Sequence, residues 1–398
     1  MAIRKNNKKI YSSGVMLLFV LIFFFKPICF QYISNLSILE TVYTLGKFVI
    51  VFIALSSFIL NNYPNYHIDK TIKRILIFEL WILFITIVLK GNVFRSFIDL
   101  ITIITMVIIV INSIKENTSK SLSILKKFSI VIIIVQLLSC IFYPTGIPSD
   151  KYFNNTGNPL YFMTSSNGTT FLCIFAISIF LLTRNKQNHW KNDICIFLAI
   201  VTSFLSGSST SLICSLLIII MYIISSISNN KLIKNGKFLF VIYVVLMYFL
   251  LMDNSFFNNL FSLITGKTGF TGRTNIWIKA IDLIKASPIF GYGVIDEGYI
   301  KIWGGTLAAH NTILEILLQS GIIGLLLWIS IILAFRKDIS KISNNKIKSI
   351  FIISLFVNLI SLSMESFIHS VYFFAMIALG AAMYQNEKEK MEKEIKNG

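Results

Sequence analysis

The stretch KTGFTGRTNIWIKAIDLIKASPIFGYGVIDEGYIKIWGGTLAAHNTILEILLQSGIIG, residues 267–324, differs in composition from the sequence on either side of it. It is rich in Arg, His, Trp, Gly, Pro and acidic residues, whereas most of the chain alternates long apolar runs with short lysine-rich connectors. The apolar runs predict the fold. We expect any chemistry to take place in residues 267–324, which interrupt these runs.

The apolar runs place the chain among membrane proteins. Hydrophobic residues make up 55% of the 398 residues, charged residues make up 14%, and the mean hydropathy is +0.76. Many runs are close to the roughly 20 residues that cross a bilayer as a helix. We therefore predict an all-α integral membrane protein with about twelve transmembrane helices. The predicted spans are 14–33, 41–60, 73–90, 95–113, 126–143, 169–184, 193–208, 210–228, 237–253, 318–335, 347–364 and 367–384.

These spans divide the chain into four predicted parts. Residues 1–252 hold the first nine helices, and residues 253–317 form a large extracytoplasmic loop with an amphipathic helix. Residues 318–384 hold the last three helices, and residues 385–398 form a charged cytoplasmic tail. We expect the catalytic residues in the loop 253–317.

The positions of the lysines and arginines predict the orientation. With the N-terminus inside, 26 of the 36 fall in inside connectors and tails, 8 fall outside and 2 lie within spans. Positive connectors stay in the cytoplasm, so both termini are predicted to be cytoplasmic in a multi-pass cell-membrane protein. The net charge of +18 is spread beside the membrane, where it meets anionic lipid, and we do not interpret it as a nucleic-acid site.

Neither the N-terminus nor the cysteines indicate export as a soluble protein. The basic N-terminus precedes an apolar run as in a secretory signal, but no small-x-small cleavage site follows, so we predict an uncleaved first span. The five cysteines are single and widely spaced. We expect them to be apolar packing residues.

Lys47 and Glu79 are exceptions among the apolar residues of the first five spans. An ionisable side chain at depth in a membrane usually faces a cavity or a partner, but a long one can also extend to the interface. Both interpretations stand for Lys47. Glu79 lies a turn and a half from the predicted cytoplasmic end of its span, so for Glu79 we expect the side chain to reach the interface.

The predicted outside connector 144–168 is rich in Pro, Gly, Asn, Ser and aromatic residues. Hydroxyl groups, amides and aromatic faces commonly bind sugars, although an ordinary turn-rich surface loop has the same composition. The candidate glycan contacts are Tyr152, Asn155, Tyr161 and Asn167.

Residues 274–286 are predicted to form an amphipathic helix that Pro288 prevents from continuing. The apolar face holds Ile276, Trp277, Ala280, Ile281 and Ile284, and the polar face holds Asn275, Lys279, Asp282 and Lys285. We expect this helix to lie flat in the outer membrane interface, with Trp277 as an interfacial anchor.

Arg273 precedes this helix, where the free N–H groups of a helix N-terminus favour an anion. A guanidinium there suits phosphate oxygens, although a solvated loop arginine is an equal alternative. The segment 288–294 is a turn whose two glycines allow positive φ or close backbone approach. His310 and Asn311 then precede an apolar run, and His310 is a candidate proton acceptor beside Arg273, although a lone histidine is usually structural.

The order and spacing of these residues resemble those of the O-antigen polymerase and ligase family of bacterial membrane proteins. The resemblance is strongest over about residues 200–335. The matching residues are Arg273, Trp277, Pro288, Gly291, Gly293, His310, Asn311, Gly321 and Gly324.

The resemblance implies a GT-C-like membrane glycosyltransferase that acts without metal or cofactor at the outer face of the membrane. Its substrate would be an undecaprenyl-pyrophosphate-linked oligosaccharide, with membrane lipids and a chain-length regulator as further partners. Arg273 would bind the donor pyrophosphate and His310 would activate the acceptor hydroxyl, with Asn311 and Trp277 also contacting substrate. The sequence departs from the family at the turn 206–211, where many members have an arginine and this chain has Ser209. Ser209 and neighbouring hydroxyls, or Arg95 from another loop, would then make the second phosphate contact.

The proposed chemistry is consistent with the residues even without the family. Breaking a glycosyl-pyrophosphate bond needs stabilisation of negative charge on the leaving group, and attack by a sugar hydroxyl needs a base. Arg273 and His310 are suitable for these two roles. We find no outside Asp-x-Asp or His/Cys cluster that suggests a metal.

Glu365 and His369 surround the predicted outside turn between the last two spans. They could extend the site by orienting a base or contacting sugar hydroxyls, although an ordinary helix end is the alternative.

Polymerase and ligase differ in the acceptor, so the choice between them rests on circumstance. Heavy use of Lys, Ile, Asn and Phe indicates an AT-rich genome, which fits a capsule-bearing Gram-positive cell without a lipopolysaccharide core. A Wzy-type polymerase for capsule or O-antigen is therefore favoured, and a ligase is the enzyme alternative. A flippase or transporter of lipid-linked sugars is the non-enzyme alternative, but we find no internal repeat of the kind transporters show.

Overall fold

The chain folds as a bundle of long helices with a small cap at one end. The computed structural model describes residues 13–62, 70–149, 159–185, 187, 189–228, 236–251, 273–295, 298–302 and 305–397. The first helices are α1 (Ser13–Phe24), α2 (Cys29–Tyr32), the 3-10 helix η1 (Ser34–Leu36), α3 (Ser37–Asn62), α4 (Lys70–Val88), α5 (Val93–Glu116) and α6 (Thr118–Phe142). They are followed by α8 (Thr169–Thr183), α9 (His189–Leu205), α10 (Ser209–Ser228), α12 (Lys237–Leu251), α14 (Arg273–Ala286), α15 (Thr312–Ile339), α16 (Asn345–Met364) and α17 (Val371–Asn397).

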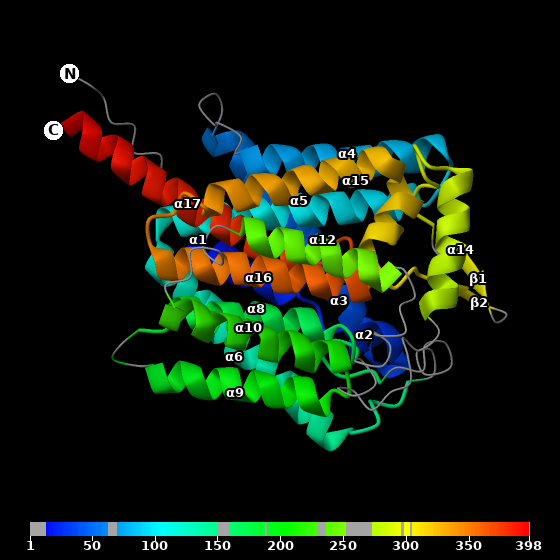
Figure 1. Ribbon diagram of the computed structural model, residues 1–398, viewed down its shortest axis with the longest axis horizontal. Coiled ribbons are helices and arrows are strands. Elements are labelled where there is room, and N and C mark those ends of the chain that lie inside the picture. Colours follow the sequence, from blue (N-terminus) through cyan, green and yellow to red (C-terminus); the bar gives the residue numbers. More distant parts are fainter. Residues whose placement is uncertain are drawn as a thin grey trace.

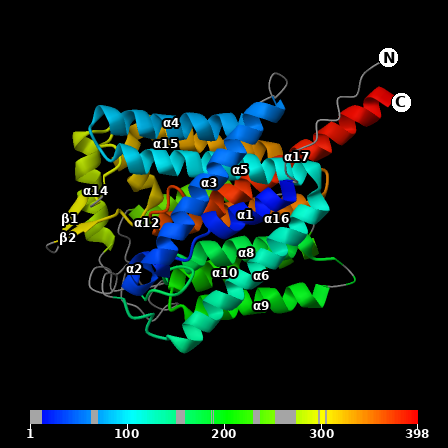
Figure 2. The ribbon, with the colours of Figure 1, turned by 180° about the vertical axis from the view of Figure 1, so that it is seen from behind.

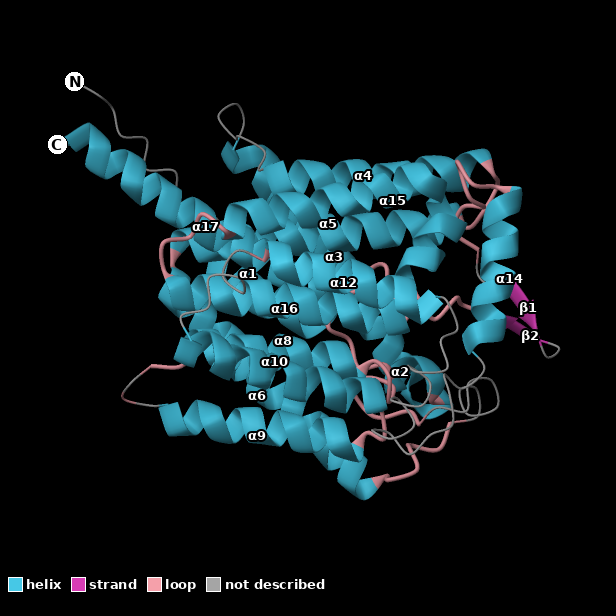
Figure 3. Cartoon of the chain, in the orientation of Figure 1, coloured by secondary structure: helices cyan, strands magenta, loops and turns pink. Residues whose placement is uncertain are grey.

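Most of these helices run side by side along the long axis of the molecule (Figure 1). The helix α14 lies across the end of the bundle, next to the strands β1 (Ile300–Ile302) and β2 (Gly305–Leu307). These three elements form the cap of the bundle. The two strands pair antiparallel, with Ile300 opposite Leu307. The C-terminal part of α17 projects from the opposite end (Figure 3). The view from behind shows α3 crossing the neighbouring helices obliquely (Figure 2).

The prediction of an all-α integral membrane protein is confirmed, and each of the twelve predicted spans coincides with a helix or, for the first, with α1 and α2 together. Within the described residues, seven segments are long and apolar enough to cross a membrane. They are Gly14–Tyr32, Ser34–Ala54, Val93–Glu116, Thr118–Phe142, Ser209–Ile227, Thr312–Ile339 and Asn345–Met364. The helix α8 is apolar but shorter, with 15 residues.

The core of the bundle is built around α8, whose phenylalanines Phe171, Phe175 and Phe180 are fully buried. In contrast, α3 presents apolar side chains outward, and Phe52 is 73% exposed. Large apolar side chains are stable on an outer surface when lipid surrounds it, so this pattern fits a membrane-embedded bundle.

The turn at residues 288–294 is docked on a kink in α15, and this contact positions the cap. Gly321 has φ +64 inside α15, and a Cβ atom there would lie 2.0 Å from the carbonyl oxygen of Ile289. Tyr292 N donates to Leu318 O at 2.7 Å, and Gly293 N donates to Gln319 O at 2.9 Å. The predicted need for glycine in this turn is confirmed, because Gly291 and Gly293 both have positive φ.

The helix α15 begins at Thr312, six residues before the predicted span. Residues 312–320 form a helical segment beyond the kink, and the side chain of Asn311 caps it by accepting from the N–H groups of Ile313 and Leu314. This outer segment of α15 places His310 at the edge of the cap.

Candidate active site

The side chain of Arg273, at the start of α14, is held by the end of α16. Its Nη2 donates to Glu365 Oε1 at 2.7 Å, and its Nη1 donates to the carbonyl oxygen of Met364 at 2.6 Å. The side chain of Arg273 is 15% exposed and that of Glu365 is 3% exposed. Arg273 is therefore a partly buried, paired arginine, so the alternative of a solvated loop arginine is wrong, and its binding of phosphate stays a prediction.

His310 lies on the other side of the same carboxylate. Its Nδ1 is 3.4 Å from Glu365 Oε2, and its side chain is 30% exposed. Its backbone has φ +46, which is uncommon for a residue other than glycine. One buried carboxylate thus contacts both residues that the sequence singled out, and His310 keeps an exposed part that a substrate can reach.

The backbone around His310 is fixed by side chains from α15 and from the turn that follows α16. Ala309 N donates to Glu315 Oε2 at 2.7 Å, and Asn311 N donates to Ser366 Oγ at 3.1 Å. Ser366 Oγ in turn donates to Glu315 Oε2 at 3.3 Å. These bonds offset the cost of the positive φ and hold His310 beside Glu365.

The turn that carries Glu365 is itself bound to the first residue of α15. Thr312 Oγ1 donates to Glu365 O at 2.6 Å and accepts from Phe367 N at 3.2 Å. Sequence reasoning identified Glu365 but missed Glu315, Thr312 and Ser366. An acidic residue within the apolar run ILEILL was a usable sign for Glu315, whereas nothing local distinguishes Thr312 or Ser366.

The predicted apolar face of α14 is correct, but it packs against protein and not against the membrane interface. Trp277 is 4% exposed, and its Nε1 donates to the carbonyl oxygen of Ala309 at 3.0 Å. It packs in a small core with Ile276, Ala280, Tyr299, Ile300, Ala309, Leu314 and Leu318. The interpretation of Trp277 as an interfacial anchor is therefore wrong, because the outer part of α15 and the strand β1 cover the ring. Trp277 instead supports the backbone next to His310.

Glu365 contacts Arg273 and His310, whereas His369 belongs to a second cluster of charged side chains. His369 lies in the turn between α16 and α17, with Nε2 3.1 Å from Glu79 Oε2 and Nδ1 3.5 Å from Asp99 Oδ2. Burial alone would lower the pKa of His369, but the carboxylates of Glu79 and Asp99 outweigh it and raise this pKa to about 9. The cluster joins α4, α5 and the turn before α17.

The same cluster corrects the prediction for Glu79. Its side chain is 1% exposed and faces His369, so it does not reach the membrane interface. The helix α4 begins at Lys70, which places Glu79 near its middle and too far from the end to reach water. Lys47 is half-buried, and its Nζ lies 5.9 Å from the ring centroid of Phe24.

Arg95 lies in the first turn of α5, near both clusters. Its Nη1 is 3.5 Å from the carbonyl oxygen of Ile295, and its charge acts on both Tyr299 and His369. Burial raises the pKa of Tyr299, so its hydroxyl stays protonated and donates to the carbonyl oxygen of Gly293. The guanidinium of Arg95 is thus close to the site but faces the loop 291–295.

Ser209 begins α10, on the turn after α9. Within the part of the chain that the structure describes, no contact joins Ser209 to Arg273 or His310. Ser206, three residues before Ser209, accepts hydrogen bonds at its carbonyl oxygen from Ser166 Oγ at 2.7 Å and Tyr161 Oη at 3.4 Å. The ring of Tyr161 is fully buried, so the prediction of a glycan contact there is wrong.

The remaining loop candidates are not tested. Asn167 is half-buried in the same loop, while Tyr152 and Asn155 lie outside the described residues.

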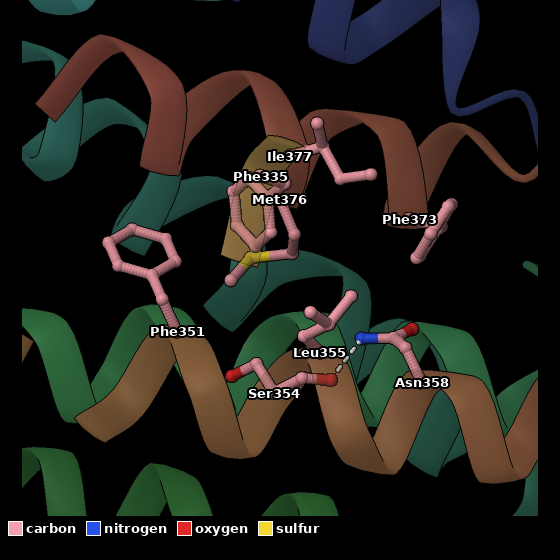
Figure 4. A pocket seen from close by; sticks show the side chains of 8 residues that line it. All are labelled: Phe335, Phe351, Ser354, Leu355, Asn358, Phe373, Met376 and Ile377. Carbon is pink, nitrogen blue, oxygen red and sulfur yellow. Dashed lines mark hydrogen bonds between the residues drawn. The ribbon is translucent and has the colours of Figure 1, made fainter. Parts of the chain in front are cut away.

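No group of three or more His, Cys, Asp or Glu residues in the described ranges is arranged to hold a metal ion. A small cavity of about 10 Å³ lies between α15, α16 and α17, and neither Arg273 nor His310 lines it (Figure 4). It is bordered by Ser354 and Asn358, whose Nδ2 donates to Ser354 O at 2.8 Å, among apolar side chains. It has room for about one water molecule, so it is a packing defect and not a substrate site.

Comparison with known proteins identifies the segment that carries this site. Residues 194–329 match the model of the O-antigen ligase family, and this segment contains both Arg273 and His310. This segment, about a third of the chain, is therefore similar to the O-antigen ligase family. The resemblance inferred from the motif residues is confirmed over this segment, and Glu365 lies beyond it.

Two curated relatives agree with the family match. A protein of Rickettsia conorii named as a candidate polysaccharide ligase is 35% identical over 91 residues, which are 20% of this chain and 22% of that protein. A protein of Rickettsia felis with the same description is 32% identical over 108 residues, which are 24% of this chain and 26% of that protein. The likeness to these relatives thus covers about a quarter of their length.

Proposed function

We propose that this protein is a membrane glycosyltransferase that polymerises a polysaccharide at the outer face of the cell membrane. It would transfer a growing glycan from undecaprenyl pyrophosphate to a hydroxyl of a second lipid-linked repeat unit. The observation that carries the proposal is the shared carboxylate of Glu365, which brings Arg273 and His310 next to each other.

Arg273 serves as the group that binds the leaving pyrophosphate. It lies at the start of α14, where the helix N-terminus adds a favourable potential for an anion. Its guanidinium now contacts Glu365 and the carbonyl oxygen of Met364, so an incoming pyrophosphate replaces or shares those partners. Stabilising the charge that develops on the leaving group is worth about a hundredfold in rate or more.

His310 serves as the base. The hydroxyl oxygen of the acceptor attacks the anomeric carbon of the donor, the bond from that carbon to the pyrophosphate oxygen breaks, and the hydroxyl proton moves to His310. Glu365 next to Nδ1 holds the proton of the neutral imidazole on that nitrogen, which leaves Nε2 to accept the new proton. A positioned base contributes about a hundredfold or more.

The acceptor separates the two enzyme alternatives. The names of the family model and of the curated relatives favour a ligase, in which the acceptor is a different molecule. The composition of the chain favours a polymerase in a cell without a lipopolysaccharide core. A polymerase makes long glycan that stays on lipid pyrophosphate, whereas a ligase moves glycan to an acceptor without pyrophosphate.

The experiment compares variants of both residues in cells that supply the lipid-linked repeat unit. We expect His310→Ala to stop chain growth while donor binding remains, because a base acts mainly in the transition state. His310→Asn is the better-folded variant, since asparagine tolerates positive φ. Arg273→Lys should weaken both donor binding and turnover, and Arg273→Ala should weaken them more, because lysine keeps the charge but loses the two-pronged geometry.

The readouts are a ladder of glycan lengths and binding of a lipid pyrophosphate to purified protein. Lys279→Ala is the matched control, because Lys279 is an exposed cation on the same helix. Long glycan from His310→Asn protein at normal expression would remove the assignment of His310 as base. Full binding and turnover in Arg273→Ala would remove the role of Arg273.

A further inference from the structure

A polar pocket with a volume of about 430 Å³ opens at the end of the bundle opposite to α14. This is the end that carries the C-terminal part of α17, and the lysine distribution predicts that it faces the cytoplasm. The pocket is bordered by the connection between α8 and α9, by α10 and by the first turn of α16. Its lining residues are Arg184, Asn185, His189, Tyr222 and Lys346.

The cations of this pocket are held in place. Arg184 donates from Nε to Asp193 Oδ1 at 2.8 Å and from Nη2 to Asp193 Oδ2 at 3.0 Å. Lys346 Nζ donates to the carbonyl oxygen of Arg184. The pocket therefore holds two basic side chains, and the carboxylate of Asp193 pairs with one of them, Arg184. The guanidinium, ammonium, amide and phenol groups supply hydrogen-bond donors from several directions.

We propose that this pocket binds a phosphate group. A preorganised guanidinium next to an ammonium is well suited to the oxygens of a phosphate, because both form short charge-assisted hydrogen bonds with them. The Arg184–Asp193 pair leaves the pocket positive overall while it fixes the direction of the guanidinium. The pocket is separate from Arg273 and does not depend on the function proposed for it.

Neighbouring side chains place the pocket at the depth of phospholipid head groups. Trp190, next to His189, is 54% exposed, and the Nζ of Lys191 lies 5.4 Å from its ring centroid. Tryptophan with a nearby lysine is typical of the membrane–water interface. On α10, the exposed apolar side chains of Leu216 and Ile220 precede Tyr222, on the side of the bilayer interior, and offer a surface for acyl chains. The phosphate therefore comes from an anionic lipid head group or from soluble phosphate at the same level.

The test measures both sources on purified full-length protein. The first arm counts the phosphatidylglycerol molecules that the protein retains, by native mass spectrometry after purification from mixed vesicles. The second arm measures the shift in melting temperature that inorganic phosphate causes relative to chloride at equal ionic strength. We expect Lys346→Gln to lower retention of phosphatidylglycerol about fivefold, since one basic residue near the surface contributes about that much.

Lys348→Gln is the matched control, because it removes the same charge two residues further along α16 from a side chain that does not line the pocket. Lys346→Arg keeps the charge and should keep the binding. Loss of the inorganic-phosphate shift in Lys346→Gln, with unchanged lipid retention, would also support the phosphate site and assign it to a soluble ligand. Equal behaviour of Lys346→Gln and Lys348→Gln in both arms would overturn the proposal.

Discussion

The carboxylate of Glu365 accepts a hydrogen bond from Arg273 Nη2 at 2.7 Å and lies 3.4 Å from His310 Nδ1 with its other oxygen. Arg273 begins α14, His310 precedes Asn311 at the start of α15, and Glu365 follows the last residue of α16. Because Glu365 is almost completely buried, its charge is compensated by the guanidinium of Arg273 and not by water. Any anion that binds Arg273 must therefore change the interactions of Glu365.

We expect Glu365→Gln to reduce both stability and turnover. The substitution keeps the shape of the side chain but leaves the partly buried Arg273 without its carboxylate. The free energy of unfolding should fall by about 3 kcal/mol, as for other buried pairs that lose one member. Turnover should fall at least about tenfold, because His310 loses the group that orients it. Thermal unfolding in detergent and the glycan ladder measure the two effects.

Asp193→Asn provides the control for this prediction. It breaks the Arg184–Asp193 pair, whose side chains are 35% and 43% exposed. Exposed pairs contribute about 0 to 1 kcal/mol, so its effect on stability should be small. If Glu365→Gln and Asp193→Asn behave alike in both measurements, the buried carboxylate has neither role.

The local elements that carry Arg273 and His310 could be predicted from the sequence better than the contact of these residues with Glu365. The helix 274–286 and the glycine-dependent turn follow from local rules of periodicity and backbone freedom, and the structure contains both. The contact of Arg273 with Glu365 joins residues 92 positions apart. It depends on how α14, α15 and α16 pack together, which no local pattern encodes.

Gly321→Ala is expected to disrupt the junction between the cap and the bundle. Its φ of +64 is unfavourable for alanine, and the new Cβ would lie 2.0 Å from the carbonyl oxygen of Ile289. Gly207 has a similar φ of +70, but a Cβ added there would have no atom within 4 Å, so Gly207→Ala has only the backbone cost of about 1 kcal/mol. Gly321→Ala should lose about 3 kcal/mol or more, since backbone atoms must also move. Equal melting temperatures of the two variants would show that the docking of residues 288–294 on α15 is not important for stability.

A labelling experiment tests the predicted orientation in the membrane. Lys285→Cys places a thiol on the exposed face of α14, and Asn344→Cys places one before α16 at the other end of the bundle. With a membrane-impermeant maleimide on intact cells, we expect only the first to react. The parent protein is the blank, because four of its cysteines are buried and Cys195 is half-buried. Reaction of both positions in intact cells would contradict the orientation inferred from the lysines and arginines.

Trp277 and Glu79 show where reasoning from the sequence failed. An amphipathic pattern gives the direction of an apolar face but not its partner, so lipid and a second protein layer look alike for Trp277. A carboxylate within a span has two ordinary outcomes, and the choice for Glu79 depended on a helix boundary. The structure moved that boundary to Lys70, and the partner His369 is 290 positions away in the chain.

His369 should make the stability of the protein depend on pH. It faces Glu79 on α4 and both Asp99 and Arg95 on α5, and its pKa in the folded protein is raised to about 9. In the unfolded chain the pKa of histidine is about 6.5. Below about pH 6.5 both states carry the proton, so the contribution of the ion pairs to stability is fully present. Between about pH 6.5 and 9 only the folded state keeps it, so the free energy of unfolding should decrease as the pH rises through this window.

His369→Gln isolates this effect because glutamine keeps hydrogen-bonding groups but never carries the charge. At pH 6.5 the variant should be less stable than the parent by about 1 to 3 kcal/mol, since Glu79 and Asp99 lose their cation in a buried setting. The difference should shrink towards pH 9, where the parent also loses the proton. Melting temperatures in detergent from pH 6.5 to 9 measure it, with His189→Gln, which removes an exposed histidine, as a control that should keep the slope of the parent. Parallel curves for the parent and His369→Gln across this window would mean that His369 is not held protonated between the two carboxylates.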